Sequence, residues 1–155
     1  MKTLDQSSPG AEEALTQYAA LCHRKTAKGR TEVLLITSRD TGRWVIPKGW
    51  PMKGKSGAEC ALREAYEEAG VEGDPDSRCI GLYAYDKGLK GGAVQPCVVA
   101  VYPVRVRRLK DDFPEKGQRV RKWFSPRKAA SRVAEPELSE LLSQFDPDGP
   151  PAENG

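Results

Sequence analysis

The sequence predicts an α+β fold in which a mixed sheet lies between helices. Short runs of β-branched and apolar residues alternate with turn signals, which is typical of strands. Only two helical regions accompany these runs, too few to cover both faces of a doubly wound parallel sheet. Their order along the chain is three strands, a loop, a helix, three strands and a terminal helical region.

The first third of the chain predicts three strands and a long loop. The turn-rich segment 25–30 and the turn Asp40–Gly42 separate the strands. The stretch 47–55 must be a loop, because it contains two prolines and two glycines. The expected strands are residues 16–23, 32–38 and 43–46.

The clearest helix follows this loop. Ser56 and Glu59 fit a capping box, and Gly70 stands where helices commonly end with a glycine. Small side chains dominate the face that would turn toward the core, so this helix can approach a sheet closely. That face consists of Ala58, Ala61, Leu62, Ala65 and Ala69.

The second half predicts three more strands, at 78–85, 94–106 and 120–124, with a charged loop at 111–117. Ser125-Pro126 begins a terminal helical region, and Glu135-Pro136 predicts a break within it. We therefore expect a flexible leader at 1–13, one domain at 14–145 and a disordered tail at 146–155, since both ends are polar and the tail is rich in Pro and Gly.

Composition excludes several classes of protein. The 155 residues suffice for one domain, and a mean hydropathy of −0.62 excludes a membrane protein. The N-terminal stretch lacks the apolar core of a secretory signal. A net charge of +3 suits anionic substrates but does not argue for specific nucleic-acid binding. Four widely spaced cysteines argue against zinc or disulfides and favour the cytoplasm: Cys22, Cys60, Cys79 and Cys97.

Three carboxylates share one face of the helix, opposite its core face. Glu64, Glu67 and Glu68 are spaced i, i+3 and i+4, so they project from adjacent turns and repel one another. A hard cation such as Mg²⁺ or Mn²⁺ would offset that repulsion. Arg63 can pair with Glu67 one turn on. An ordinary solvated acidic face is the alternative. The lysines of the preceding loop favour the metal interpretation, because metal and ammonium groups together suit a polyphosphate.

The segment from Gly49 to Val71 resembles the signature of the Nudix hydrolase family. Gly49 begins it, and Arg63-Glu64-Ala65-Tyr66-Glu67-Glu68-Ala69-Gly70-Val71 completes it at the family's spacing. The flanking runs 44–47 and 122–125 also agree, so the resemblance covers roughly residues 16–145. It implies an α/β/α sandwich with a mixed central sheet. One departure is Lys55, which stands where the signature has Glu and puts the number and affinity of metal ions in doubt.

The resemblance implies metal-dependent hydrolysis of a pyrophosphate bond by water attack on phosphorus. Glu64, Glu67 and Glu68 would hold Mg²⁺ or Mn²⁺, and Arg63 would orient the helix carboxylates. Family members take the general base from this helix or from a later loop. In the later loop the candidates are Asp111, Asp112 and Glu115. We favour Glu115, although a solvated loop acid is the alternative.

Pro47-Lys48-Gly49 is similar to the diadenosine polyphosphate and diphosphoinositol polyphosphate hydrolases of the family. We therefore expect a polyphosphorylated small molecule as substrate. Basic side chains would contact its phosphates, and aromatic rings could stack on a base. Besides Gly49, the candidate substrate-binding residues are Lys48, Lys53, Lys55, Arg119, Arg121, Trp50, Tyr83 and Tyr85. Cys60 is expected to be a buried thiol, and His23 has no catalytic role.

Two alternatives remain open from the sequence. One is a pyrophosphatase that acts on ADP-ribose or a nucleotide sugar. The other is a binding module that holds a nucleotide-like ligand without turnover, and Lys55 is the feature that favours it. The sequence leaves open whether the protein is a monomer or a homodimer. No membrane partner is expected.

Overall fold

The computed structural model describes residues 13–149. The predicted leader lies outside this range apart from residue 13, and the predicted tail lies outside it apart from residues 146–149. Those four residues include a turn whose Asp148 carboxylate pairs with the Lys25 ammonium. Within residues 13–149, every helix is too short or too polar to cross a membrane.

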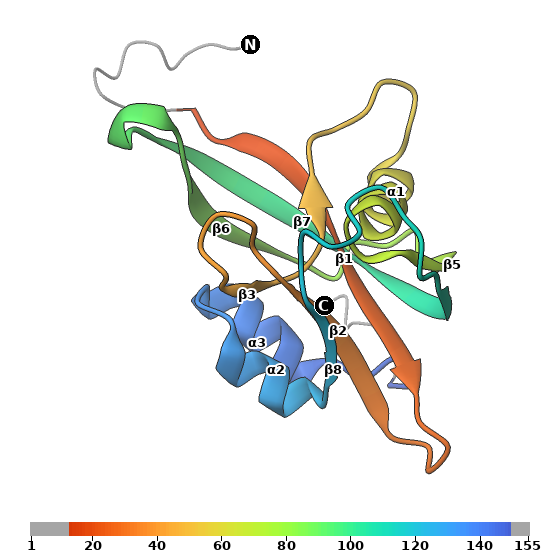
Figure 1. Cartoon of the computed structure of the whole chain (residues 1–155). Helices are drawn as coiled ribbons and strands as arrows, with labels where there is room; N and C mark the ends of the chain where they lie inside the picture. The colour runs from red at the N-terminus through yellow and green to blue at the C-terminus, as the bar shows by residue number, and fades with distance from the viewer. Residues whose placement is uncertain (1–12, 150–155) are drawn as a thin grey trace.

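An eight-stranded mixed sheet forms the middle layer (Figure 1). β1 (Leu15–Lys25) and β7 (Val94–Leu109) run parallel through it. Every other pairing is antiparallel. β7 also pairs with β5 (Val71–Pro75) and β6 (Gly81–Gly88), β1 with β2 (Thr31–Thr37) and β4 (Lys48–Gly49), and β2 with β3 (Trp44–Val45) and β8 (Arg121–Phe124). The single parallel pair makes the sheet mixed, as predicted.

Helices cover both faces of this sheet. α1 (Gly57–Ala69) packs on β1 and β5 on one face, while α2 (Pro126–Arg132) and α3 (Pro136–Gln144) pack together on the other (Figure 1). A short 3₁₀ turn at Lys90–Gly92 lies between β6 and β7. The layers are those of the predicted α/β/α sandwich. The terminal helical region breaks just before Pro136, as the proline predicts.

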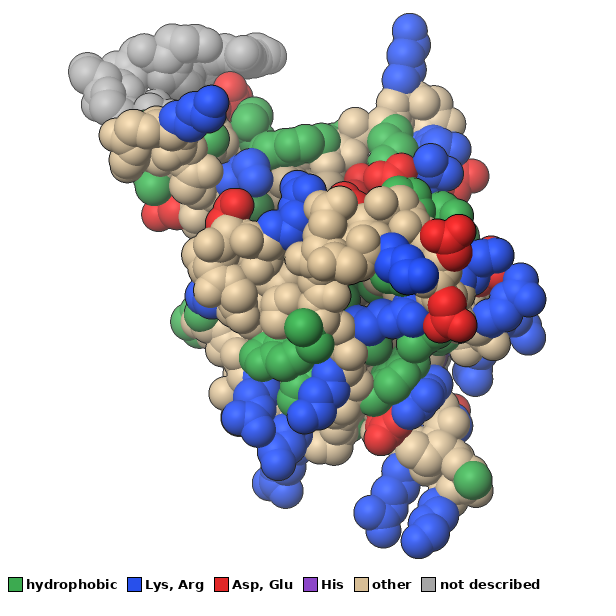
Figure 2. All heavy atoms as spheres, viewed as in Figure 1, with side chains coloured by type: hydrophobic (Ala, Val, Ile, Leu, Met, Phe, Trp, Pro, Cys, Tyr) green, Lys and Arg blue, Asp and Glu red, His purple; other side chains and the backbone are tan. Residues whose placement is uncertain are grey.

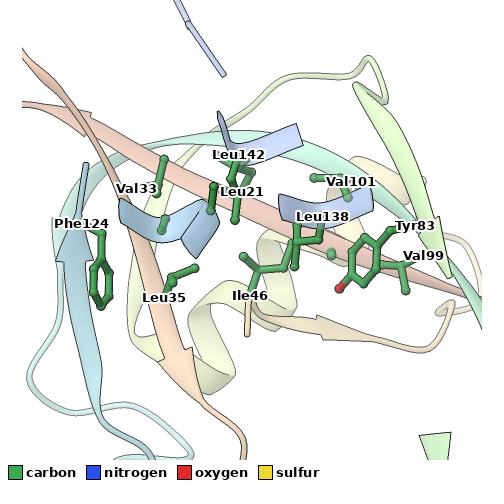
Figure 3. Packing of buried hydrophobic residues seen from close by; sticks show 13 residues of the cluster. Leu21, Val33, Leu35, Ile46, Tyr83, Val99, Val101, Phe124, Leu138 and Leu142 are labelled. Atoms are coloured by element: carbon green, nitrogen blue, oxygen red, sulfur yellow. The ribbon is translucent and has the colours of Figure 1, made fainter. Parts of the chain in front are cut away.

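The two faces are packed differently. The core under α2 and α3 contains large side chains, among them Leu21, Ile46, Phe124, Leu138 and Leu142 (Figure 3). The core under α1 consists largely of small ones, including Ala61, Ala65, Ala69, Ala20 and Cys22. Small residues allow α1 to lie close to the sheet, which matters for the acidic face it carries.

Most predicted strands shift at their ends by one to three residues, and β4, β5 and β6 differ most clearly from the sequence prediction. β5 has no apolar run, and it becomes a strand because it pairs with β7 through a bulge at Gly73. β4 occupies only two residues of the predicted loop and is held by Tyr18 and Ala19 of β1. β6 begins and ends three residues later than predicted, because its register with β7 extends the hairpin to Gly88.

Candidate active site

Both ends of α1 are fixed by caps that the sequence encodes. The Ser56 hydroxyl accepts the Glu59 N–H at 3.1 Å, and the Glu59 carboxylate accepts the Ser56 N–H at 2.8 Å. At the other end Gly70 adopts the left-handed conformation, with a φ of 72°. A side chain there would also collide with Phe113 and the Lys110 carbonyl. The capping box and the terminal glycine are therefore confirmed.

Glu64 lies directly against the backbone of β4. A Cβ atom built on Gly49 would fall inside the van der Waals radius of the Glu64 carboxyl group, so only glycine permits this approach. The fully buried Ala61 and Ala65 bring this part of α1 close to the sheet. The glycine of the motif thus makes room for an acid of the same motif.

Glu64 and Glu68 form a hydrogen-bonded carboxyl pair. Burial, opposed by the charge of Arg119 and assisted by the hydrogen bond to Glu64, raises the pKa of Glu68 to about 8. Burial also raises the pKa of Glu64, although the bond to Glu68 favours the ionised form of Glu64. In the metal-free protein the two acids therefore hold one proton between them near neutral pH.

Two cationic side chains flank this pair. The Arg119 guanidinium lies 3.8 Å from Glu68 Oε1 and is largely buried. The Lys48 backbone N–H donates to the same oxygen at 3.4 Å, and its Nζ lies 4.9 Å from the centre of the Tyr85 ring. Burial lowers the pKa of Lys48, while the charge of Glu68 opposes that shift. The pair is thus set among groups suited to phosphate.

The third acid of the motif points elsewhere. The Glu67 carboxylate lies 2.6 Å from Arg63 Nε, the pairing that the sequence predicts. Among residues 13–149, no three Asp, Glu, His or Cys side chains come together as a metal-binding group. In this structure Glu67 pairs with Arg63 rather than with the other two acids, and the role of all three in metal binding stays a prediction.

The donor set of the remaining pair fits a hard divalent cation. Glu64 and Glu68 offer only carboxylate oxygens, and their crowding is relieved here by a shared proton. A cation can take the place of that proton, because it neutralises both groups at once. Glu67 could join the pair only after leaving Arg63.

Glu115 belongs to the same cluster although it is distant in sequence. Its backbone N–H donates to the Glu67 carbonyl at 3.0 Å, which ties the 111–117 loop to the end of α1. Its carboxylate accepts from Arg119 Nε at 3.0 Å. Arg119 therefore links Glu115 to Glu68. The structure brings together Glu64, Glu68, Glu115, Arg119 and Lys48, five of the residues that the sequence singles out.

The other candidates lie outside this cluster. Lys53 and Lys55 are exposed, and Trp50 retains 41% of its accessible surface. Asp112 is exposed, and Asp111 lies 3.7 Å from Arg121 Nη2, whose guanidinium also donates to the Ala69 carbonyl at 2.6 Å. Arg121 therefore anchors the end of α1. Lys55 does not touch the carboxyl pair, so its departure from the motif leaves the pair intact.

Three further expectations concern buried residues. Cys60 is buried as predicted. His23 is buried against Phe145, with ring centroids 5.0 Å apart, on the face opposite α1. Tyr83 is buried, and the Tyr85 hydroxyl donates to Gln17 Oε1 at 2.6 Å. Neither tyrosine ring is freely exposed for stacking.

Sequence reasoning missed one buried acid near the cluster. Glu135 is 9% exposed, acts electrostatically on Lys48, and lies 3.4 Å from Arg43 Nη1. The sequence places it at the helix break before Pro136 but gives no sign that it is buried. Only the packing of α3 against the sheet brings it near Lys48.

Comparison with known proteins agrees with the motif and the layers. A family model described as the NUDIX domain matches residues 15–145. The chain belongs to the Nudix family. The Caenorhabditis elegans Ap4A hydrolase shares the fold, with a TM-score of 0.62 at 21% identity, and the match covers 86% of this chain and 96% of that one.

Two curated relatives show the range of this part of the Nudix family. Human diphosphoinositol polyphosphate phosphohydrolase 3-beta is 33% identical over 109 residues, which is 68% of this chain and 61% of the relative. Nudix hydrolase 21, chloroplastic, of Arabidopsis thaliana is 32% identical over 124 residues, 79% of this chain and 61% of the relative. The match thus spans about three-fifths of the length of each relative.

Proposed function

We propose that this Nudix protein hydrolyses a pyrophosphate bond in a polyphosphorylated small molecule, with Mg²⁺ or Mn²⁺ as cofactor. The geometry that supports it is the Glu64–Glu68 pair, which lies beside Gly49, Arg119 and Lys48, and burial raises the pKa of both acids. Burying two acids together is unfavourable unless a cation joins them. The ion would polarise a phosphoryl oxygen and lower the pKa of a bound water.

The remaining residues position charge around the phosphates. Lys48 and Arg119 would bind the anionic oxygens, since both lie beside the carboxyl pair and are largely shielded from water. Glu115 holds Arg119 through a 3.0 Å ion pair and is the proposed proton acceptor. The ion pair keeps its carboxylate directed into the cluster. Arg63 would hold the Glu67 carboxylate in an ion pair until a bound cation attracts that carboxylate.

The proposed substrates are nucleoside polyphosphates or diphosphoinositol polyphosphates. This proposal rests on Pro47-Lys48-Gly49 and on relatives whose names include both activities. Lys48 supports it further, because its buried ammonium adjoins the acids of α1. We place the activity in the cytoplasm, in a monomer or homodimer.

A phosphate-release screen tests the proposal. Diadenosine polyphosphates, diphosphoinositol polyphosphates, ADP-ribose, nucleotide sugars and nucleoside triphosphates would each be offered with Mg²⁺ and with Mn²⁺. We expect turnover of the first two groups and a loss of at least a hundredfold in Glu68→Gln. Glu140→Gln, which removes an exposed acid on α3, is the matched control.

Each outcome of the screen decides a different part of the proposal. Turnover confined to ADP-ribose would preserve the chemistry and overturn the substrate class. Full activity in Glu68→Gln would remove the carboxyl pair from the mechanism. If the folded protein hydrolyses none of these compounds but binds one of them, the chain is a binding module and the proposal is wrong.

A further inference from the structure

One oxygen of Glu135 is unsatisfied. Within residues 13–149 it is the only buried side-chain nitrogen or oxygen that lacks a hydrogen-bond partner. Glu135 occupies the N-cap position of α3, yet its side chain makes no cap hydrogen bond. The other oxygen makes only a 3.4 Å contact with Arg43. Buried acceptors are nearly always paired, so this one needs an explanation beyond the fold.

Glu135 is part of the electrostatic surroundings of the candidate active site. Lys48 feels the charges of both Glu68 and Glu135, and so does Tyr83. Lys48 is thus shared between the acid pair of α1 and this acid of α3. A phosphate held by Lys48 would have Glu135 among its charged neighbours.

A carboxylate such as Glu135 beside a bound phosphate would discriminate between charged and neutral groups of a substrate. A second phosphate beside Glu135 would face a carboxylate that Arg43 only partly neutralises, and like charges repel strongly where water is excluded. A neutral N–H or O–H group would instead supply the hydrogen bond that the free oxygen lacks. Sites built around an unpaired polar group reject ligands that cannot pair with it.

We propose that Glu135 is a specificity-determining residue. It selects substrates that carry a nucleoside, whose neutral hydrogen-bond donors lie beyond the phosphates, over substrates whose ring is phosphorylated at every position. This inference rests on the proposed function and narrows its substrate class. The oxygen is covered in the free protein, so binding must move a neighbouring side chain.

The test compares two substrates in two variants. Diadenosine tetraphosphate and diphosphoinositol pentakisphosphate would be hydrolysed by the unaltered protein, by Glu135→Gln and by Glu140→Gln. We expect the unaltered protein to prefer the diadenosine compound. Glu135→Gln should raise the KM for the diadenosine compound about tenfold with kcat nearly unchanged. The same variant should increase kcat/KM for the inositol compound. Glu140→Gln should change neither value, since its side chain is exposed.

A binding measurement separates this inference from the proposed function. Titration calorimetry with AMP and with inositol hexakisphosphate needs no turnover. Glu135→Gln should weaken the binding of AMP and strengthen that of the inositol compound. Unchanged affinities for both, or losses of equal size, would overturn the inference even if the protein is an active hydrolase.

Two further ligands identify the donor. Purine riboside 5′-monophosphate lacks the amino group of AMP, and 2′-deoxyadenosine 5′-monophosphate lacks one ribose hydroxyl. If the base amine pairs with Glu135, the first ligand binds the unaltered protein more weakly than AMP does, and that difference vanishes in Glu135→Gln. If the sugar pairs with it, the second ligand behaves in this way. If neither ligand distinguishes the two proteins, no nucleoside donor pairs with Glu135 and the inference fails.

Discussion

The two faces of the sheet solve different physical problems. Under α2 and α3, large side chains such as Leu138 and Phe124 bury apolar area, and the buried His23 adjoins this core. Under α1, the helix itself presents alanines to the core, and two of its carboxyl groups lie against the β4 backbone. A buried Leu contributes about 1.5–3 kcal/mol, and a methyl group contributes less. The α1 face thus has less apolar stabilisation, but its small side chains let α1 lie close to the sheet. This close packing buries Glu64 and Glu68 and makes them hard to ionise.

Removing a large side chain from the α3 face should give the largest effect. Leu138 is fully buried. Leu138→Ala should lower the free energy of unfolding by about 2–5 kcal/mol, because it leaves a cavity. Activity per folded molecule should change little, since Leu138 belongs to the core of the face opposite α1. Urea denaturation and an assay well below the melting temperature measure the two quantities. Leu82→Ala, at a residue that is 58% exposed, is the control.

The pH dependence of stability should reveal the acid pair. Burial raises the pKa of Glu68 to about 8 from 4.5, so between these values the folded protein holds a proton that the unfolded chain has released. Stability of the metal-free protein should therefore fall as the pH rises through that window, by up to about 1.4 kcal/mol per pH unit.

His23 contributes the opposite slope from the other face. Burial, assisted by Arg105, lowers its pKa to about 4 from 6.5, so stability rises with pH across that interval. Above pH 6.5 the contribution of His23 ends, and the slope of the acid pair remains. Denaturation with a chelator between pH 6.5 and 8 should show a decline in the unaltered protein and a flatter curve in Glu68→Gln. Equal slopes in both would mean that Glu68 is ionised throughout.

Enlarging one alanine on each face should separate packing from chemistry. Ala65→Leu crowds α1 against the sheet and should cost about 1–3 kcal/mol of stability. It should also lower kcat more than tenfold, because α1 carries Glu64 and Glu68. Ala130→Leu on α2 should cost stability with kcat preserved. If both variants lose kcat alike, close approach of α1 is not what activity requires.

The sequence predicts the fold where local rules decide it. The capping box at Ser56, the terminal glycine at Gly70 and the pairing of Arg63 with Glu67 all follow from spacing along one helix, and the structure confirms them. Spacing along the helix leaves open which acids pair, because side-chain rotamers decide whether Glu67 meets Arg63 or joins Glu64 and Glu68.

Features that depend on contacts between distant segments are harder to predict. β5 is a strand only because β7 offers it an edge, and Val-Glu-Gly-Asp-Pro has no strand pattern of its own. The burial of Glu135 depends on how α3 packs, which no local pattern encodes. Glu115 was one of three loop acids, and only its tether to the Glu67 carbonyl singles it out.

The smallest expected change tests the contact between β4 and α1. In Gly49→Ala the new methyl group would overlap the Glu64 carboxyl, which is the far end of a flexible side chain and can move aside. Stability should therefore fall by less than about 1 kcal/mol, while kcat/KM should fall about tenfold, near 1.4 kcal/mol, as Glu64 leaves Glu68. Gly88→Ala, where a methyl group meets no atom within 4 Å, is the control.

The double variant Gly49→Ala with Glu64→Asp sharpens this test. The shorter acid leaves room for the methyl group, so the small loss of stability should be recovered, because the collision is purely steric. Activity should stay low, since the Asp carboxylate no longer reaches Glu68. Recovery of both would mean that the motif glycine only avoids a collision. Recovery of stability alone would mean that Gly49 allows the full-length Glu64 side chain to reach Glu68. The alanine-lined face of α1 makes this contact possible, because it lets the helix lie close to the sheet.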